Sequence, residues 1–130
     1  MNRLQDGFYA IQDPRDPAKV TCWRKRILPQ GGQSFGPWPT GTFGTVNIRA
    51  EGSTVYRQYL DQVSDAIEVN PELAQARFAG FASRCFLCGR TLRSARWKCY
   101  GVGPECGHNF TPAELEILAG AMAEALGATS

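Results

Sequence analysis

Residues 85–92 read Cys85-Phe86-Leu87-Cys88-Gly89-Arg90-Thr91-Leu92, and residues 99–107 read Cys99-Tyr100-Gly101-Val102-Gly103-Pro104-Glu105-Cys106-Gly107. The four cysteines form two close pairs, Cys-x2-Cys and Cys-x6-Cys, separated by ten residues. Two such pairs of thiolates are typical of a tetrahedral zinc site. Glycine after the first pair accepts the positive φ that reverses the chain. The stretch therefore predicts a Zn²⁺ site with the ligands Cys85, Cys88, Cys99 and Cys106.

The size and composition of the chain predict one compact unit of 130 residues. Residues 1–82 are expected to form a sheet with helices, and residues 83–130 a zinc-ribbon-like module with a C-terminal helix. No stretch approaches the roughly 18 apolar residues of a membrane span. Residues 1–7 lack the apolar core of a signal peptide, so we expect a cytoplasmic protein.

A cytoplasmic location favours metal over disulfides, and the odd number of five cysteines points the same way. The fifth cysteine, Cys22, lies far from the others in sequence. We therefore expect it to be a small buried apolar residue.

The first half of the chain has the pattern of a small antiparallel sheet. Residues 7–11 and 19–28 read as strands on either side of a proline-rich turn, and residues 42–49 read as a third strand. Residues 29–41 are rich in glycine and proline and are predicted to form a loop. That loop carries Phe35 and Trp38, which either fold back onto the core or present a surface to a partner.

Three helices follow from the later sequence. Ser53 is a plausible N-cap for an amphipathic helix over 55–69, and Asn70 with Pro71 starts a second helix that Gly80 ends. Residues 91–98 are expected to form a short hairpin or ribbon. Residues 111–114, Thr-Pro-Ala-Glu, form a capping box before an apolar stripe that runs towards Gly127. The prediction is an α+β fold with an N-terminal antiparallel sheet, central helices, a zinc knuckle and a C-terminal helix.

Charge is distributed unevenly. The formal net charge is +2, and four thiolates with one Zn²⁺ would add about −2, which brings the folded chain close to neutral. Residues 84–100, however, contain five basic side chains and no acidic one. These side chains either shield the anionic metal centre or form a face that binds phosphates.

The metal segment resembles a short domain family of actinobacteria and their phages, whose motif reads C-x-x-C-G-R-x-L followed by G-I-G-P-x-C. Members are described as zinc-ribbon-like proteins of unknown function. The resemblance extends upstream to the strand at 7–11 and the helix at 69–78, and so covers residues 7–107. The positions that match the motif are Cys85, Cys88, Gly89, Arg90, Leu92, Gly101, Val102, Gly103, Pro104 and Cys106.

The resemblance implies a zinc module and a phage or mobile-element context, but it leaves the fourth ligand open. Many relatives carry three cysteines here, with a serine-containing spacer where this chain has residues 94–99. We expect Cys99 to be the fourth ligand. His108, the only histidine, is the alternative, although its position two residues after Cys106 strains joint ligation.

The sequence favours a protein that is not an enzyme. A closed site of four thiolates has no position for a reactive water, and deaminase and phosphate-loop motifs are absent. The first functional hypothesis is nucleic-acid binding through the ribbon, extended by the basic run at 24–26. The ribbon residues concerned are Arg90, Arg93, Arg96, Trp97, Lys98 and Tyr100. The alternative is an adaptor or inhibitor that contacts a host protein through Phe35, Trp38 and the C-terminal helix.

Overall fold

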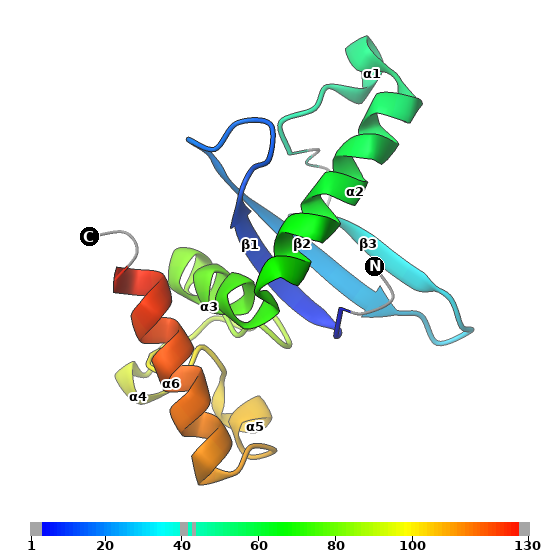
Figure 1. The fold of residues 1–130 in the computed structure, drawn as a ribbon. Helices are drawn as coiled ribbons and strands as arrows, with labels where there is room; N and C mark the ends of the chain where they lie inside the picture. The colour runs from blue at the N-terminus through cyan, green and yellow to red at the C-terminus, as the bar shows by residue number, and fades with distance from the viewer. Residues whose placement is uncertain (1–3, 40–41, 43, 128–130) are drawn as a thin grey trace.

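The computed structural model describes residues 4–39, 42 and 44–127, and it shows an α+β fold (Figure 1). Three strands, β1 (Gly7–Gln12), β2 (Val20–Ile27) and β3 (Gln33–Trp38), form an antiparallel sheet in the order β1-β2-β3. In this sheet Tyr9 faces Trp23, and Trp23 faces Pro37. The fold class predicted from the sequence is confirmed.

Strand β1 is covered on both faces, because the alternation of its side chains divides them between two apolar clusters. Phe8 and Ala10 belong to a cluster that also contains Phe86 of the metal segment. Tyr9 and Ile11 belong to a second cluster, which contains Trp23 of β2. The remaining large members of the second cluster are Leu4, Val46, Tyr59, Val63 and Ile67.

The two long central helices cover this sheet. Helix α1 (Ile48–Glu51) is a single turn, and α2 (Ser53–Val69) buries Tyr59, Val63 and Ile67 against the second cluster. Helix α3 (Pro71–Ala82) packs against β1 and against α6. The predicted start of α3 is confirmed, because the Asn70 side chain accepts a hydrogen bond from the Leu73 N–H at 3.2 Å. The helix passes Gly80 and ends after Ala82, where Ser83 adopts the left-handed conformation.

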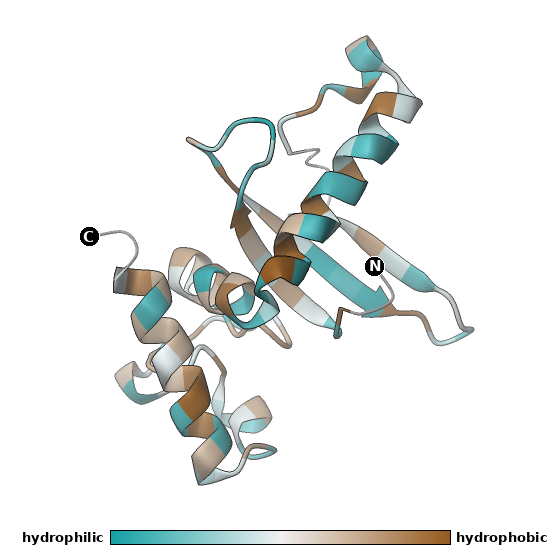
Figure 2. Cartoon of the chain, in the orientation of Figure 1, coloured by the Kyte–Doolittle hydropathy of each residue, from teal (hydrophilic) through white to brown (hydrophobic). Residues whose placement is uncertain are grey.

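The last third of the chain forms the metal segment and the C-terminal helix. The short turns α4 (Ala95–Lys98) and α5 (Pro104–Gly107) precede α6 (Pro112–Gly127). The predicted capping box is confirmed: the Thr111 N–H donates to Glu114 Oε1 at 2.9 Å, and the Glu114 N–H donates to Thr111 Oγ1 at 3.2 Å. Figure 2 contrasts the largely hydrophilic α2 with the largely apolar α6.

Besides the end of α3, three local predictions are wrong. Ser53 is the first residue of α2 instead of its N-cap, a position that Gly52 holds without a side-chain hydrogen bond. The third strand lies at 33–38, inside the predicted loop, whereas the described part of residues 42–49 leads into α1 instead of forming a strand. Pro37 fits a strand because β3 lies at the edge of the sheet, where a missing N–H costs little. Residues 95–98 form the helical turn α4 instead of a hairpin.

No helix in the described ranges is both long enough and apolar enough to cross a bilayer.

A buried carboxylate joins the sheet to α2 and to the segment before α1. Asp13 is fully buried and accepts hydrogen bonds from the hydroxyls of Thr45 at 2.7 Å, Thr21 at 3.1 Å and Tyr59. It also accepts one from the Arg15 N–H at 2.9 Å. Burial alone would raise the pKa of Asp13, but these hydrogen bonds outweigh it and hold the pKa below its usual value.

The Asp13→Asn variant is expected to unfold more easily at neutral pH, by on the order of 2 kcal/mol, because the amide replaces an acceptor oxygen with a donor. A carboxyl whose pKa is lowered by folding stabilises the protein above its unfolded pKa of about 3.9 and loses this effect as pH falls through the folded value. The difference in free energy of unfolding between the two proteins should therefore shrink below about pH 4. Denaturant unfolding at several pH values measures this difference. Asp16→Asn, at a residue that is not fully buried, is the matched control, and an equal loss in both variants would contradict the assignment.

Candidate metal centre

The first cysteine pair lies on a tight reversal of the backbone. The Cys85 N–H donates to the Arg90 carbonyl at 2.8 Å, and the Gly89 N–H donates back to the Cys85 carbonyl at 2.9 Å. Gly89 has the predicted positive φ, 79°, and a side chain there would press on the ring of Phe8. Arg84 fixes the same turn, because its Nη1 donates to the Gly89 carbonyl at 2.8 Å. Local hydrogen bonds thus fix the path of the chain between the two cysteines.

The second half of the site returns through Gly101 and α5. The Gly101 carbonyl accepts a hydrogen bond from the Phe86 N–H at 3.1 Å, which joins the two halves of the segment. Gly101 has a φ of 77° and contacts Met122 of α6, so a larger residue would be strained and crowded. Pro104 then starts α5, and the turn brings Cys106 back towards the first pair.

Three thiols converge at this point. The Sγ atoms of Cys85, Cys88 and Cys106 all lie within 4.8 Å of one another, and the group is close enough to hold a metal ion. Zn–S bonds of about 2.3 Å in a tetrahedral site place the sulfurs roughly 3.8 Å apart, so a small contraction would seat the ion. Three soft sulfur donors suit Zn²⁺ better than magnesium or calcium, which prefer oxygen ligands.

The electrostatics of the three thiols favour a bound cation. Burial raises the pKa of Cys85, but the backbone N–H groups of Cys88, Gly103 and Leu87 donate to its sulfur and bring the net pKa below the usual value. Burial, together with the neighbouring Cys85 and Cys88 sulfurs, raises the pKa of Cys106 to about 12. Negative charge on one sulfur thus opposes ionisation of the next, and a bound divalent cation offsets this electrostatic repulsion.

The structure does not bring the predicted fourth ligand to this group. Cys99 is exposed, and its sulfur lies outside the cluster of Cys85, Cys88 and Cys106. The reason is the helical turn α4, which continues through Cys99. Trp97 packs against Gly107, and a residue two positions further along a helix points about 200° away. His108 is also exposed and outside the group, with its ring 6.2 Å from that of Trp97.

The predicted basic and aromatic residues fall into three sets. Arg90 pairs with Glu105 at 2.5 Å, and both side chains are exposed. Trp97 and Tyr100 are half-buried and pack on the cluster that contains Phe86, with their rings 5.9 Å apart. The basic side chains of this segment that remain exposed without a hydrogen bond or ion pair within the described ranges are Arg93, Arg96 and Lys98.

Two other predictions concern residues outside the metal segment. Phe35 stacks on Trp23 at 5.7 Å, and Trp38 contacts Phe8 and Phe78, so both half-buried rings fold back onto the core. Cys22 is buried as predicted, and burial raises its pKa to about 11.

Sequence reasoning missed three residues that shape the centre. The Leu87 N–H donates to the Cys85 sulfur, which is a role that the two-residue spacing of the pair makes available. Arg84, and not Arg90, binds the carbonyl of the turn. Gly107 gives Trp97 its place beside the second pair, and its only signal in the sequence is a glycine directly after Cys106.

Comparison of the chain with protein-family models, with curated proteins and with solved structures found no match. The resemblance to the actinobacterial and phage zinc-ribbon-like family therefore stays a prediction. The metal centre is inferred from the geometry of the chain itself.

We expect the purified protein to hold one Zn²⁺ per chain and to lose it on Cys85→Ala, Cys88→Ala or Cys106→Ala. Each of these changes removes one of three converging sulfurs, whereas Cys99→Ala removes an exposed sulfur outside the group. Native mass spectrometry measures the zinc content, and thermal unfolding with and without a chelator measures its effect on stability. Loss of zinc from Cys99→Ala to the same extent would show that α4 rearranges and that Cys99 is a ligand after all.

Proposed function

We propose that this protein is a small zinc-binding protein without enzymatic activity, which binds nucleic acid through basic side chains beside the metal centre. The observation that carries the proposal is the exposed set Arg93, Arg96 and Lys98, none of which has an acidic partner within the described part of the chain. Unpaired cations held on a short ordered segment are a suitable surface for phosphates.

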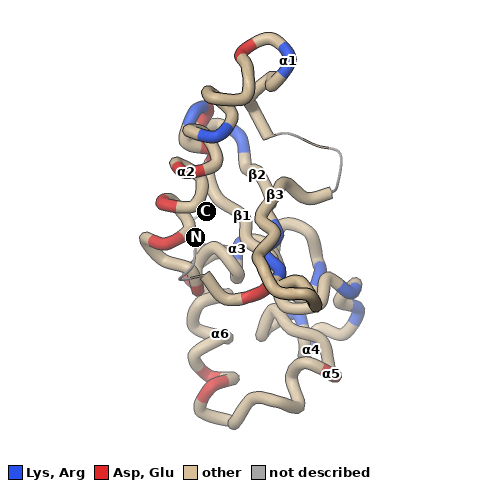
Figure 3. Tube along the Cα trace, turned by 90° about the vertical axis from the view of Figure 1, so that its right-hand side faces the viewer, with Lys and Arg blue, Asp and Glu red and all other residues tan. Residues whose placement is uncertain are grey.

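The charge distribution supports this surface. Residues 84–100 carry only basic charges, whereas α6 carries three glutamates and no basic residue. Figure 3 shows acidic residues along α2 and α6 and a group of basic residues near α4. With three thiolates instead of four, the bound metal would leave a net charge of about +1 instead of about zero. The basic face is therefore less neutralised than a four-thiolate site implies.

Contacts with phosphates fit the structure better than stacking on bases. The Trp97 ring lies against Gly107, and the Arg96 guanidinium sits 5.0 Å from the ring centroid. Tyr100 is half-buried in the same packing. Neither ring presents the free face that single-stranded bases need for stacking. Lys25 of the basic run at 24–26 is also buried, so only Arg24 and Arg26 extend the surface.

The metal has a structural role in this proposal. A zinc ion with three cysteine ligands can activate water in deaminases, but those enzymes also need a His-x-Glu element, which this sequence lacks. Cys85, Cys88 and Cys106 would hold the ion, and the ion would fix the two halves of the segment against each other. The proposed phage or mobile-element context is supported by the resemblance of the motif alone.

Binding of a labelled oligonucleotide is expected to weaken linearly on a plot of log affinity against log salt. The double variant Arg93→Gln/Lys98→Gln should weaken binding and reduce that slope by about 1 to 2, because each lost phosphate contact removes roughly 0.7–0.9. Fluorescence anisotropy with single-stranded and duplex oligonucleotides measures both quantities.

The matched control is Arg49→Gln/Arg57→Gln, which removes the same charge from exposed positions on α1 and α2. This control should leave the slope nearly unchanged. Equal effects of the two double variants would show nonspecific attraction without a binding face. Affinity independent of salt would contradict the phosphate mode altogether.

A further inference from the structure

The surface between β2 and α3 differs from the basic face and carries exposed apolar side chains. Phe81 on α3 is 65% exposed, and Val20 at the start of β2 is 39% exposed. One exposed phenylalanine needs no explanation by itself. Here, however, Phe81 borders two hollows, and Val20 lines both of them.

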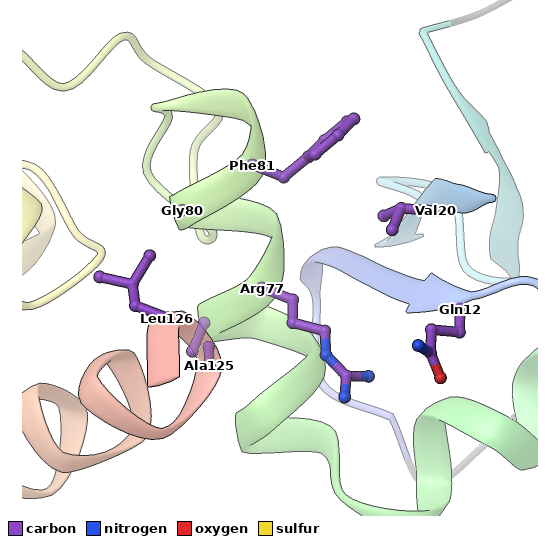
Figure 4. Close-up of a pocket in the computed structure, with 8 residues that line it drawn as sticks. Gln12, Val20, Arg77, Gly80, Phe81, Ala125 and Leu126 are labelled. Carbon is purple, nitrogen blue, oxygen red and sulfur yellow. The ribbon is translucent and has the colours of Figure 1, made fainter. Parts of the chain in front are cut away.

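The first hollow has a volume of about 290 Å³ and lies between α3, the end of α6 and the β1–β2 edge (Figure 4). Its walls are mainly apolar and are contributed by Val20, Ala76, Phe81, Ala125 and Leu126. The second hollow, of about 230 Å³, is also bordered by Phe81 and is lined by Pro37, Trp38 and Pro39 among others. Phe81 and Val20 thus line both hollows.

One cationic side chain, Arg77, lines the first hollow. Figure 4 shows the Arg77 side chain extending from α3 towards Gln12 of β1. Arg77 is half-buried and has no hydrogen bond or ion pair within the described ranges. Arg77 and Phe81 are four residues apart on α3 and therefore share one helix face. A second guanidinium, that of Arg84, lies 5.5 Å from the Trp38 ring, which lines the second hollow.

We propose that this surface docks a short acidic segment of another protein, with bulky apolar side chains on both sides of its carboxylate. The apolar side chains would fill the two hollows that Phe81 borders. The carboxylate would pair with the Arg77 guanidinium and accept a hydrogen bond from the Gln12 amide. Charge complementarity selects this occupant, because a half-buried, unpaired guanidinium among apolar walls favours a carboxylate over a neutral or basic group.

The interaction is independent of nucleic-acid binding. Its central residues, Arg77 and Phe81, belong to α3, whereas Arg93 and Lys98 of the basic face follow the first cysteine pair. The Trp38 ring, which the sequence placed either on the core or at a partner surface, contributes here as a wall of the second hollow. Phe35 lines neither hollow.

The test is selection of a displayed library of short random peptides on the full chain loaded with zinc. Enriched peptides are expected to carry an acidic residue flanked by bulky apolar ones. The best of them, made synthetically, should bind Phe81→Ser at least roughly tenfold more weakly than the unchanged protein. Ile117→Ser on α6 is the matched control, because Ile117 is 66% exposed and lines neither hollow.

A charge exchange tests the role of Arg77. Arg77→Glu should weaken binding of the acidic peptide by at least roughly tenfold. The same variant should bind more tightly a peptide in which lysine replaces the acidic residue. Circular dichroism of each variant confirms that it is folded. No enrichment, or enriched peptides that bind Phe81→Ser and Ile117→Ser equally well, would overturn the proposal.

Two further outcomes would also overturn it by identifying another occupant. Concentration-dependent dimers in size-exclusion chromatography that disappear in Phe81→Ser would show that a second copy covers this surface. Loss of oligonucleotide binding in Phe81→Ser, with the basic face unchanged, would assign the surface to nucleic acid.

Discussion

The backbone of Phe86 joins the candidate metal centre to the sheet. Its carbonyl accepts a hydrogen bond from the Phe8 N–H of β1 at 2.7 Å, and its N–H donates to the Gly101 carbonyl at 3.1 Å. Phe86 directly follows Cys85, and the Phe86 side chain is buried in the same cluster as Phe8. Phe86 therefore links the first cysteine pair, the turn at Gly101 and the edge strand β1. A metal ion that ordered the cysteine sulfurs would therefore also order the contact between the metal segment and the sheet.

This arrangement separates the chemistry of the chain into distinct surfaces. The metal segment presents basic side chains to solvent, whereas α3 and the start of β2 present an apolar surface with the Arg77 guanidinium, which has no ion pair among the described residues. The acidic residues of α2 and α6 lie apart from the basic group near α4 (Figure 3). A small chain can hold such different surfaces because two apolar clusters, one on each face of β1, fix the elements that carry them.

The elements that the sequence predicted well are those decided by local chemistry. Asn70 and Thr111 cap their helices through bonds within three residues, and Gly89 reverses the chain after a fixed spacing. Strand β3 was missed because Gly36 and Pro37 have the composition of a loop, and only the long-range pairing with β2 makes them a strand. Residues 42–49 alternate like a strand, but Thr45 binds Asp13 and Asn47 caps α1.

The position of Cys99 outside the group of three sulfurs could not be predicted for a similar reason. Spacing along the chain reports that four thiols can approach one point, but it does not report where each side chain points. The turn α4 gives the inward position to Trp97, whose large ring buries more apolar surface than a thiol would. The packing of Trp97 thus leaves Cys99 outside the group of converging cysteines.

The covered edge of β1 has a consequence for the protein without its metal. A strand at the margin of a sheet offers backbone donors and acceptors to any other extended chain. The Phe8 N–H donates a hydrogen bond to the metal segment, so release of that segment would expose an unpaired edge of β1. Metal binding by the thiolates would then reduce aggregation through this edge. A shortage of the metal ion would shorten the time for which the chain stays monodisperse.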